Sequence, residues 1–290
     1  MSDLQKGHLL NFLSVLALAV GPLLSKFGLL QISSGYAALI NAATIVAASF
    51  LYSLIKKNKV RLILEKNVIL LAVFNSLGVI FLFLSMELLS PVEIGFLGRF
   101  YTVFAVILAV IFLKERLARV EVIFICSAVA GVFLFVEPGG DYKANLLGSL
   151  FALLYTFFFA LTNIYIKKTM SADKNSNSLL FTNNIFSIGI ISVYVVAGGG
   201  TAGGTFSLEG AGFIILSSLL GGFLGTLLLY EALKYLRFSI ANVTRAFSPL
   251  LLAVISYPFF PIEITLKNTA GAILIVGSIL FLALGDKKKS

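Results

Sequence analysis

Long apolar runs separated by short polar segments dominate the chain. A helix rises ~1.5 Å per residue, so roughly 20 apolar residues cross the ~30 Å hydrocarbon core of a bilayer. The pattern therefore predicts an all-α integral membrane protein with ten transmembrane helices. The ten windows are 8–30, 34–55, 67–88, 91–113, 120–137, 145–166, 178–197, 210–231, 239–260 and 267–285.

Composition leads to the same class of protein. Of the 290 residues, 59% are hydrophobic and only 12% are charged. A soluble domain carries about 25% charged residues, so the composition excludes an ordinary soluble fold. We expect a multi-pass protein of the cell (inner) membrane, surrounded by lipid.

The basic residues predict the orientation. With the N-terminus inside the cell, 17 of the 22 lysines and arginines fall in the inner loops and tails, and only Lys143 and Lys267 in the outer loops. Cytoplasmic loops carry an excess of Lys and Arg, so both termini are predicted to be cytoplasmic. The net charge of +9 then reflects membrane orientation, and we expect no nucleic-acid partner.

Two segments half a chain apart, 86–117 and 230–264, carry similar markers in the same order. The pairs are Glu87 with Glu231, Arg99 with Arg245, Glu115 with Glu263 and, further on, Gly131 with Gly277. Each half would hold five helices, and an odd number inverts one half relative to the other, an arrangement that supports alternating access. We therefore expect two inverted repeats, 1–140 and 141–290. The alternative is a chance likeness between apolar segments.

The motifs in these segments resemble a known family. The stretches YEALKYLRFSIANVTRAFSPLLLAVI (230–255) and PIEITLKNTAGAILIVGSILFL (261–282) are similar to those of EamA-type transporters of the drug/metabolite transporter superfamily. FLKERL (112–117) and SAVAGVFLFV (127–136) repeat these elements in weaker form. The resemblance implies a transporter built from two five-helix halves. Members of the superfamily move amino acids, nucleobases, sugar phosphates or nucleotide sugars, so the resemblance does not name the substrate.

Two arginines, Arg99 and Arg245, lie inside apolar windows. A central charge costs roughly 2.5–3.5 kcal/mol on insertion, so such a residue faces a cavity, a partner or a ligand. Entering from opposite sides, both reach the middle of the membrane, where two guanidinium groups would suit bidentate binding of phosphate or carboxylate. The alternative is an ion pair with Glu87, Glu93 or Glu231 that fixes the helices.

Other polar and aromatic residues of the windows are further candidates. Lys26 follows a kink predicted at Gly21-Pro22, but it could instead extend to the membrane surface. Intramembrane amides bind ligands or join helices, and tyrosines stack on a substrate or fill the core. The candidates beside the arginines are Lys26, Asn41, Asn183, Tyr101, Tyr155 and Asn242. The small residues Ser217, Ser218, Gly221 and Gly225 predict close helix packing alone.

Enzyme chemistry has little support. The chain has one histidine and one cysteine, so no His-based metal cluster or catalytic triad is possible, and no nucleotide-binding motif fits its context. We expect no catalytic residues, no metal and no cofactor. Because no Asp or Glu lies at mid-membrane depth, facilitated transport or exchange is favoured over proton antiport.

The sequence thus predicts a secondary transporter that moves a small anionic or zwitterionic metabolite, an organic phosphate or carboxylate, by alternating access. One alternative is an exporter of amino acids or neutral metabolites in which the arginines are structural. Another is a non-transporting lipid-handling or scaffold protein, which would not need two matched halves. A monomer and a homodimer both fit the pattern.

Overall fold

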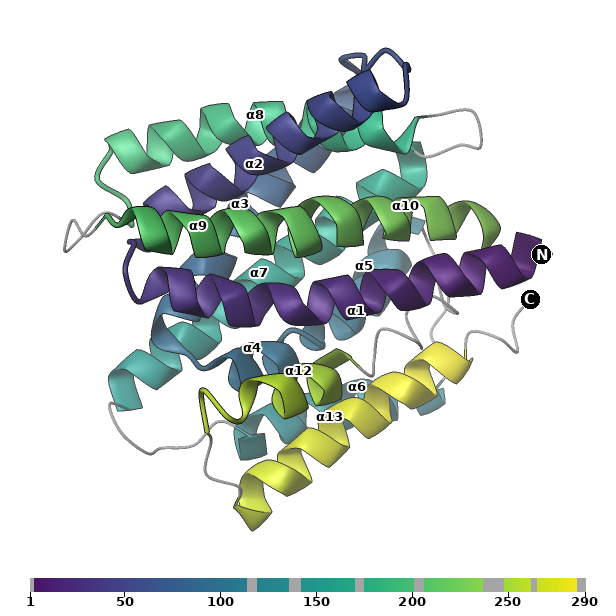
Figure 1. Cartoon of the computed structure of the whole chain (residues 1–290). Helices are drawn as coiled ribbons and strands as arrows, with labels where there is room; N and C mark the ends of the chain where they lie inside the picture. The colour runs from purple at the N-terminus through teal and green to yellow at the C-terminus, as the bar shows by residue number, and fades with distance from the viewer. Residues whose placement is uncertain are drawn as a thin grey trace.

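The computed structural model is a bundle of helices lying side by side, with no strand in the part of the chain that it describes (Figure 1). Arg245 and Asn242 lie outside the described residues. The described residues are 3–113, 119–135, 142–169, 175–200, 206–236, 248–261 and 265–285.

The described part of the first half contains six helices, which overlap the first five predicted windows. The fourth window holds two short helices instead of one. The helices are α1 (Asp3–Leu29), α2 (Ser34–Ile55), α3 (Lys66–Leu88), α4 (Pro91–Leu97), α5 (Phe100–Leu113) and α6 (Arg119–Phe135).

The described part of the second half begins with two long helices. Its third window is one helical rod whose middle is a π-helix. The elements are α7 (Tyr142–Thr169), α8 (Ser176–Val196), α9 (Leu208–Ser217), the π-helix η1 (Ser218–Gly225), α10 (Thr226–Tyr235), α12 (Ser248–Ser256) and α13 (Leu266–Gly285).

The turn between α3 and α4 is fixed by local chemistry. Ser90 Oγ accepts a hydrogen bond from Glu93 N at 3.3 Å, and Glu93 Oε2 accepts one from Ser90 N at 2.7 Å. This reciprocal capping satisfies two backbone donors, and Pro91 at the first helical position has no N–H to satisfy. The sequence S-P-V-E therefore turns the chain immediately after α3.

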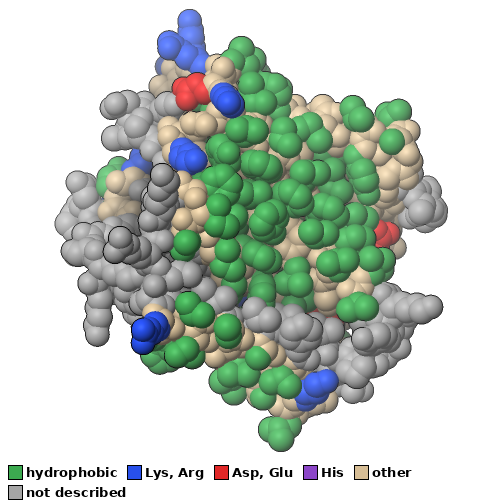
Figure 2. Space-filling view, turned by 180° about the vertical axis from the view of Figure 1, so that it is seen from behind, with side chains coloured by type: hydrophobic (Ala, Val, Ile, Leu, Met, Phe, Trp, Pro, Cys, Tyr) green, Lys and Arg blue, Asp and Glu red, His purple; other side chains and the backbone are tan. Residues whose placement is uncertain are grey.

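The bundle exposes the apolar surface of a membrane protein. One face is a continuous area of hydrophobic side chains, with lysines and arginines near its margins (Figure 2). Six helices of the described part are long and apolar enough to cross a membrane: Gln5–Leu29, Ser34–Ile55, Lys66–Leu88, Leu146–Ile166, Ser176–Val196 and Leu208–Ala232. The count of ten spans and the cytoplasmic termini stay predictions.

Four sets of helix contacts organise the bundle. α3 packs on α7, and α1 packs along α9, η1 and α10, while α2 faces α8 and α6 faces α13 (Figure 1). The N-terminal end of α1 and the C-terminal end of α13 lie at the same end of the bundle. The helices α1, α3 and α7 thus have neighbours on several sides, and their inner faces surround the centre.

The break between α4 and α5 occurs at Gly98 and Arg99, where the apolar pattern predicts one helix. Arg99 N donates to Phe96 O at 3.0 Å and Tyr101 N to Gly98 O at 3.3 Å. Both bonds span three residues instead of four, which tightens the backbone and ends one helix before the next begins. The break lies against the cavity described below.

Candidate functional site

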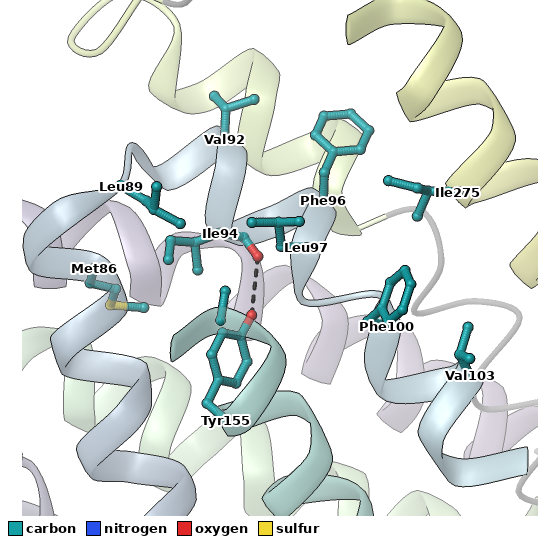
Figure 3. Packing of buried hydrophobic residues seen from close by; sticks show 11 residues of the cluster. Met86, Leu89, Val92, Ile94, Phe96, Leu97, Phe100, Val103, Tyr155 and Ile275 are labelled. Atoms are coloured by element: carbon teal, nitrogen blue, oxygen red, sulfur yellow. Dashed lines mark hydrogen bonds between the residues drawn. The ribbon is translucent and has the colours of Figure 1, made fainter. Parts of the chain in front are cut away.

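A cavity of about 310 Å³ lies at the centre of the bundle. Its walls come from α1, α2, α3, α7, α8, η1, α10 and α12, together with the break between α4 and α5. Several buried apolar clusters adjoin it. One contains Met86, Ile94 and Tyr155 (Figure 3), and another contains Ile45 and Leu180.

Arg99 lines this cavity, and it is the one charged side chain among the described lining residues. The backbone break positions it, and Tyr155 of α7 supports the break. Tyr155 Oη donates to Ile94 O at 3.1 Å (Figure 3). Gly98 lies directly under the Tyr155 hydroxyl, where a Cβ would overlap it. The glycine therefore lets α7 approach the segment that carries Arg99.

The glutamates proposed as alternative partners of Arg99 have interactions of their own. Glu93 Oε2 accepts the Ser90 backbone N–H, and Glu231 Oε1 forms an ion pair with Lys234 Nζ at 2.9 Å. Glu87 lies at the exposed C-terminal end of α3 and is not among the cavity-lining residues. The first two interactions stabilise helix ends, and an ion pair with Arg99 stays an alternative prediction.

Both predicted amides within the described residues, Asn41 and Asn183, line the cavity. Asn41 Nδ2 donates to Ser218 Oγ at 2.8 Å, joining α2 to η1. Asn183 is buried, and its Oδ1 has no hydrogen-bond partner among the described residues. Asn41 thus both joins two helices and lines the cavity. Asn183 leaves a buried hydrogen-bond acceptor next to the cavity.

Both predicted tyrosines also line the cavity. Tyr155 is buried and packs edge-to-face against Phe159, with ring centroids 5.8 Å apart. Tyr101 lies two residues after Arg99, and its side chain is half-buried. The cavity lining thus includes two tyrosine side chains besides Arg99.

Lys26 is not among the residues that line the cavity. Its Nζ donates to Met86 O at 2.7 Å and to Glu87 O at 3.3 Å, at the C-terminal end of α3. The last carbonyls of a helix lack intrahelical partners and carry partial negative charge, so a cation there is stabilised. The lysine joins α1 to α3, and its predicted role in binding stays a prediction.

Sequence reasoning missed one wall of the cavity. Ser217, Gly221, Gly222 and Thr226 line it from the π-helix η1 and its two ends, although the small residues there predicted helix packing alone. The packing itself is present, since Gly21 and Gly221 are in close contact. π-helical turns within α-helices occur frequently at functional sites. The Gly221-Gly222 pair inside a long apolar run was the available signal.

Two further amides, Asn75 and Asn163, also line the cavity. Asn75 Nδ2 donates to Ser187 Oγ at 3.3 Å, and Asn163 Nδ2 to Phe159 O at 2.7 Å. Within the described ranges, no group of three or more His, Cys, Asp or Glu could hold a metal ion. The cavity chemistry there consists of one cation, amides, hydroxyls and aromatic rings.

Comparison with known proteins agrees with this architecture. The model of the EamA-like transporter family matches the chain twice, over residues 5–137 and 146–284. An uncharacterized transporter in the sor 3′ region of Acidianus ambivalens is 28% identical over 116 residues, which cover 40% of this chain and 46% of that protein.

A solved crystal structure shares the fold at 14% sequence identity. It superposes with a TM-score of 0.68 and covers 98% of this chain and 99% of the other. At this identity the likeness concerns the fold alone. The two family matches together span nearly the whole sequence. The chain therefore belongs to the EamA-like transporter family.

Proposed function

We propose that this membrane transporter moves a small anionic or zwitterionic metabolite, an organic phosphate or carboxylate, across the cytoplasmic membrane by alternating access. Arg99 and Arg245 form the anion-binding pair in this proposal. The observation that carries it is Arg99, the one charged side chain among the described residues lining a central cavity.

The chemistry of the guanidinium group supports an anionic substrate group. An arginine presents two parallel N–H donors to a carboxylate or phosphate. A substrate that carries such a group can therefore bind Arg99 through two charge-assisted hydrogen bonds. The cavity volume of about 310 Å³ is at the small end of ligand sites, which fits a small metabolite.

The arrangement of helices supports alternating access. Under the proposed repeat, α2 corresponds to α8 and α6 to α13, and each of these pairs packs together. The packing of α3 on α7 likewise corresponds to that of α1 on α9, η1 and α10. Transporters with inverted repeats bind substrate at the interface of the halves, and one half moves against the other.

Two of the apolar clusters that adjoin the cavity are suited to act as gates. The cluster around Met86 and Ile94 lies near the turn between α3 and α4, and the cluster around Ile45 and Leu180 lies between other helices. We propose that these clusters separate in alternation. Each opening would then expose Arg99 to one side of the membrane.

The test is substrate-dependent thermal stabilisation of the purified protein across a metabolite panel, followed by uptake into proteoliposomes. Arg99→Gln should weaken binding of the anionic substrate by roughly tenfold or more, because hydrogen bonds to charged groups are worth about 1.5–3 kcal/mol. Arg119→Gln is the matched control, because Arg119 is exposed at the start of α6. Unchanged binding and transport in a folded Arg99→Gln protein would contradict the proposal.

Other outcomes of the same panel identify the rival functions. An exporter of neutral metabolites would be stabilised by neutral compounds equally with and without Arg99. A lipid-handling or scaffold protein would respond to no small metabolite and would transport none. Either result replaces the anion-binding function.

A further inference from the structure

Three of the hydroxyl groups that line the cavity donate their protons to backbone carbonyls. Thr162 Oγ1 donates to Phe158 O at 2.9 Å, and Thr226 Oγ1 to Gly221 O at 3.3 Å. Tyr155 Oη also donates to a carbonyl, that of Ile94. A hydroxyl has a single proton, so each of these oxygens retains lone pairs and no donor for a ligand.

The amides of Asn163 and Asn184 are oriented by the same principle. Asn163 Nδ2 donates to Phe159 O at 2.7 Å, and Asn184 Nδ2 to Leu180 O at 2.9 Å. A backbone carbonyl only accepts hydrogen bonds, so the NH₂ end of each amide must face its own helix. The oxygen end is thereby turned away from the helix backbone.

Asn41 is oriented through a relay of two bonds. Ser218 Oγ donates its single proton to Ile214 O at 2.7 Å. The hydroxyl therefore accepts the bond from Asn41 Nδ2 at 2.8 Å, and the amide cannot be reversed without losing it. The hydrogen bonds thus fix the orientation of the amide group of three cavity residues, one each on α2, α7 and α8.

The Oδ1 atoms of Asn41, Asn163 and Asn184, here called the acceptor set, accept no hydrogen bond from the described residues. None of these three oxygen atoms is fully enclosed by protein, and all three residues line the cavity. Asn183 adds a fourth amide whose oxygen lacks a partner. The acceptor set therefore presents three oxygen atoms with free lone pairs beside the cavity.

We infer that the acceptor set recognises hydrogen-bond donors on the substrate, so that the transported compound carries an ammonium or hydroxyl group beside its anionic group. The anionic half of this inference rests on the proposed function of Arg99. An ammonium group has three donors and no acceptor, and hydroxyls also donate. An anion without donors would place its own lone pairs against the acceptor set.

This arrangement predicts strong discrimination. A site built to hydrogen-bond a polar group rejects the analogue that lacks it, because the buried acceptors of the site are then left unpaired. The discrimination acts between compounds of equal charge at the anionic end. It is therefore separable from the contribution of Arg99.

The experiment uses two sets of probes with matched skeletons. The first set is leucine, leucic acid and isocaproic acid; the second is aminoethyl phosphate, hydroxyethyl phosphate and ethyl phosphate. Binding is measured by thermal stabilisation of the purified full chain and by competition in proteoliposome uptake. Within at least one set, the amino or hydroxy compound should bind roughly tenfold more tightly than the donor-free acid. The stronger of the two identifies the donor as ammonium or hydroxyl.

The variants locate the effect. Asn184→Leu should reduce the preference to near parity, and Asn163→Leu provides the same test if the first protein does not fold. Asn177→Leu is the control. Asn177 lies seven residues before Asn184 on α8 and is buried, but it does not line the cavity, and its Nδ2 donates to Ser49 O. This variant should retain the preference.

The outcomes separate this inference from the proposed function. Equal binding within both sets, a preference that survives both Asn184→Leu and Asn163→Leu, or no binding by any probe would overturn the acceptor set. If Arg99→Gln leaves binding of every probe intact while the donor preference persists, the anion-binding function fails and the acceptor set stands. If Arg99→Gln weakens the binding of all probes equally and no donor preference exists, the anion-binding function stands and the acceptor set fails.

Discussion

Two helix interfaces beside the cavity differ in the size of the side chains that form them. Where α1 meets η1, the contact is between small residues. A methyl group on Gly21 would lie only 3.6 Å from Gly221 Cα, so the backbones are close together. Ser217 Oγ donates to Gly21 O at 2.8 Å, and Ser14 Oγ to Gly225 O at 2.6 Å, so hydroxyls join the two backbones directly.

The interface of α3 with α7 is built from phenylalanine rings. The ring of Phe81 stacks on Phe158 with centroids 5.8 Å apart and an interplanar angle of 4°, and it also lies 5.8 Å from Phe151. Gly78 accommodates Phe159, whose ring occupies the space of a Cβ. Here ring area, rather than backbone proximity, fills the contact.

Under the proposed repeat these two interfaces are counterparts, since α1 corresponds to α7 and α3 to the rod of α9, η1 and α10. The same arrangement of helices is thus held by two kinds of packing. Small residues allow close approach and interhelical hydrogen bonds, while aromatic pairs add dispersion and quadrupole attraction. The first interface should be sensitive to added volume and the second to lost ring contacts.

The largest effect is expected from Gly221→Leu. A leucine side chain needs space where the α1 backbone lies, and overpacking costs about 1–3 kcal/mol or more. The yield of monodisperse protein and its thermal midpoint should both fall sharply. The matched control is Gly212→Leu on α9, because nothing lies within 4 Å of a Cβ at that glycine. Equal behaviour of the two proteins would show that close backbone approach does not limit this interface.

A smaller effect is expected from Phe81→Leu in the aromatic interface. The substitution keeps an apolar side chain but removes both ring contacts, and aromatic pairs contribute about 0.5–1.5 kcal/mol beyond their buried area. The free energy of unfolding in detergent should therefore drop by about 1 kcal/mol or somewhat more. Phe50→Leu on the exposed face of α2 is the control and should change little. An unaltered Phe81→Leu protein would mean that lipid or neighbouring side chains replace the ring contacts.

The length of the apolar windows predicted the helices of the described part. Backbone N–H and C=O groups in lipid must be hydrogen-bonded within the segment, and an α-helix satisfies this requirement. The same reasoning predicted that Arg99 avoids lipid, and it lies at the cavity. Tyr101, Tyr155, Asn41 and Asn183 also line the cavity, as their intramembrane polarity indicated. Their role in binding substrate stays a prediction.

The irregular elements could not be predicted because contacts distant in sequence stabilise them. The carbonyl of Ile94 at the α4–α5 break accepts its bond from Tyr155, 61 residues away. The π-helix has its Gly225 carbonyl bonded by Ser14, 211 residues away. Lys26 likewise bonds the end of α3 at Met86 O, 60 residues away. Hydropathy and spacing contain no information on such partners.

The smallest effect is expected from Ser217→Ala, which separates hydrogen bonding from close packing in the interface of α1 with η1. It removes the bonds to Gly21 O and Ser25 Oγ and leaves the glycine contact intact. Interhelical hydrogen bonds in membrane proteins average about 0.6 kcal/mol, because the separated helices find other partners, so the loss of unfolding free energy should be of this order. Ser85→Ala is the control, since Ser85 bonds Leu82 O within its own helix. A loss as large as that of Gly221→Leu would make the hydroxyls, rather than the close backbones, the main source of stability at this interface.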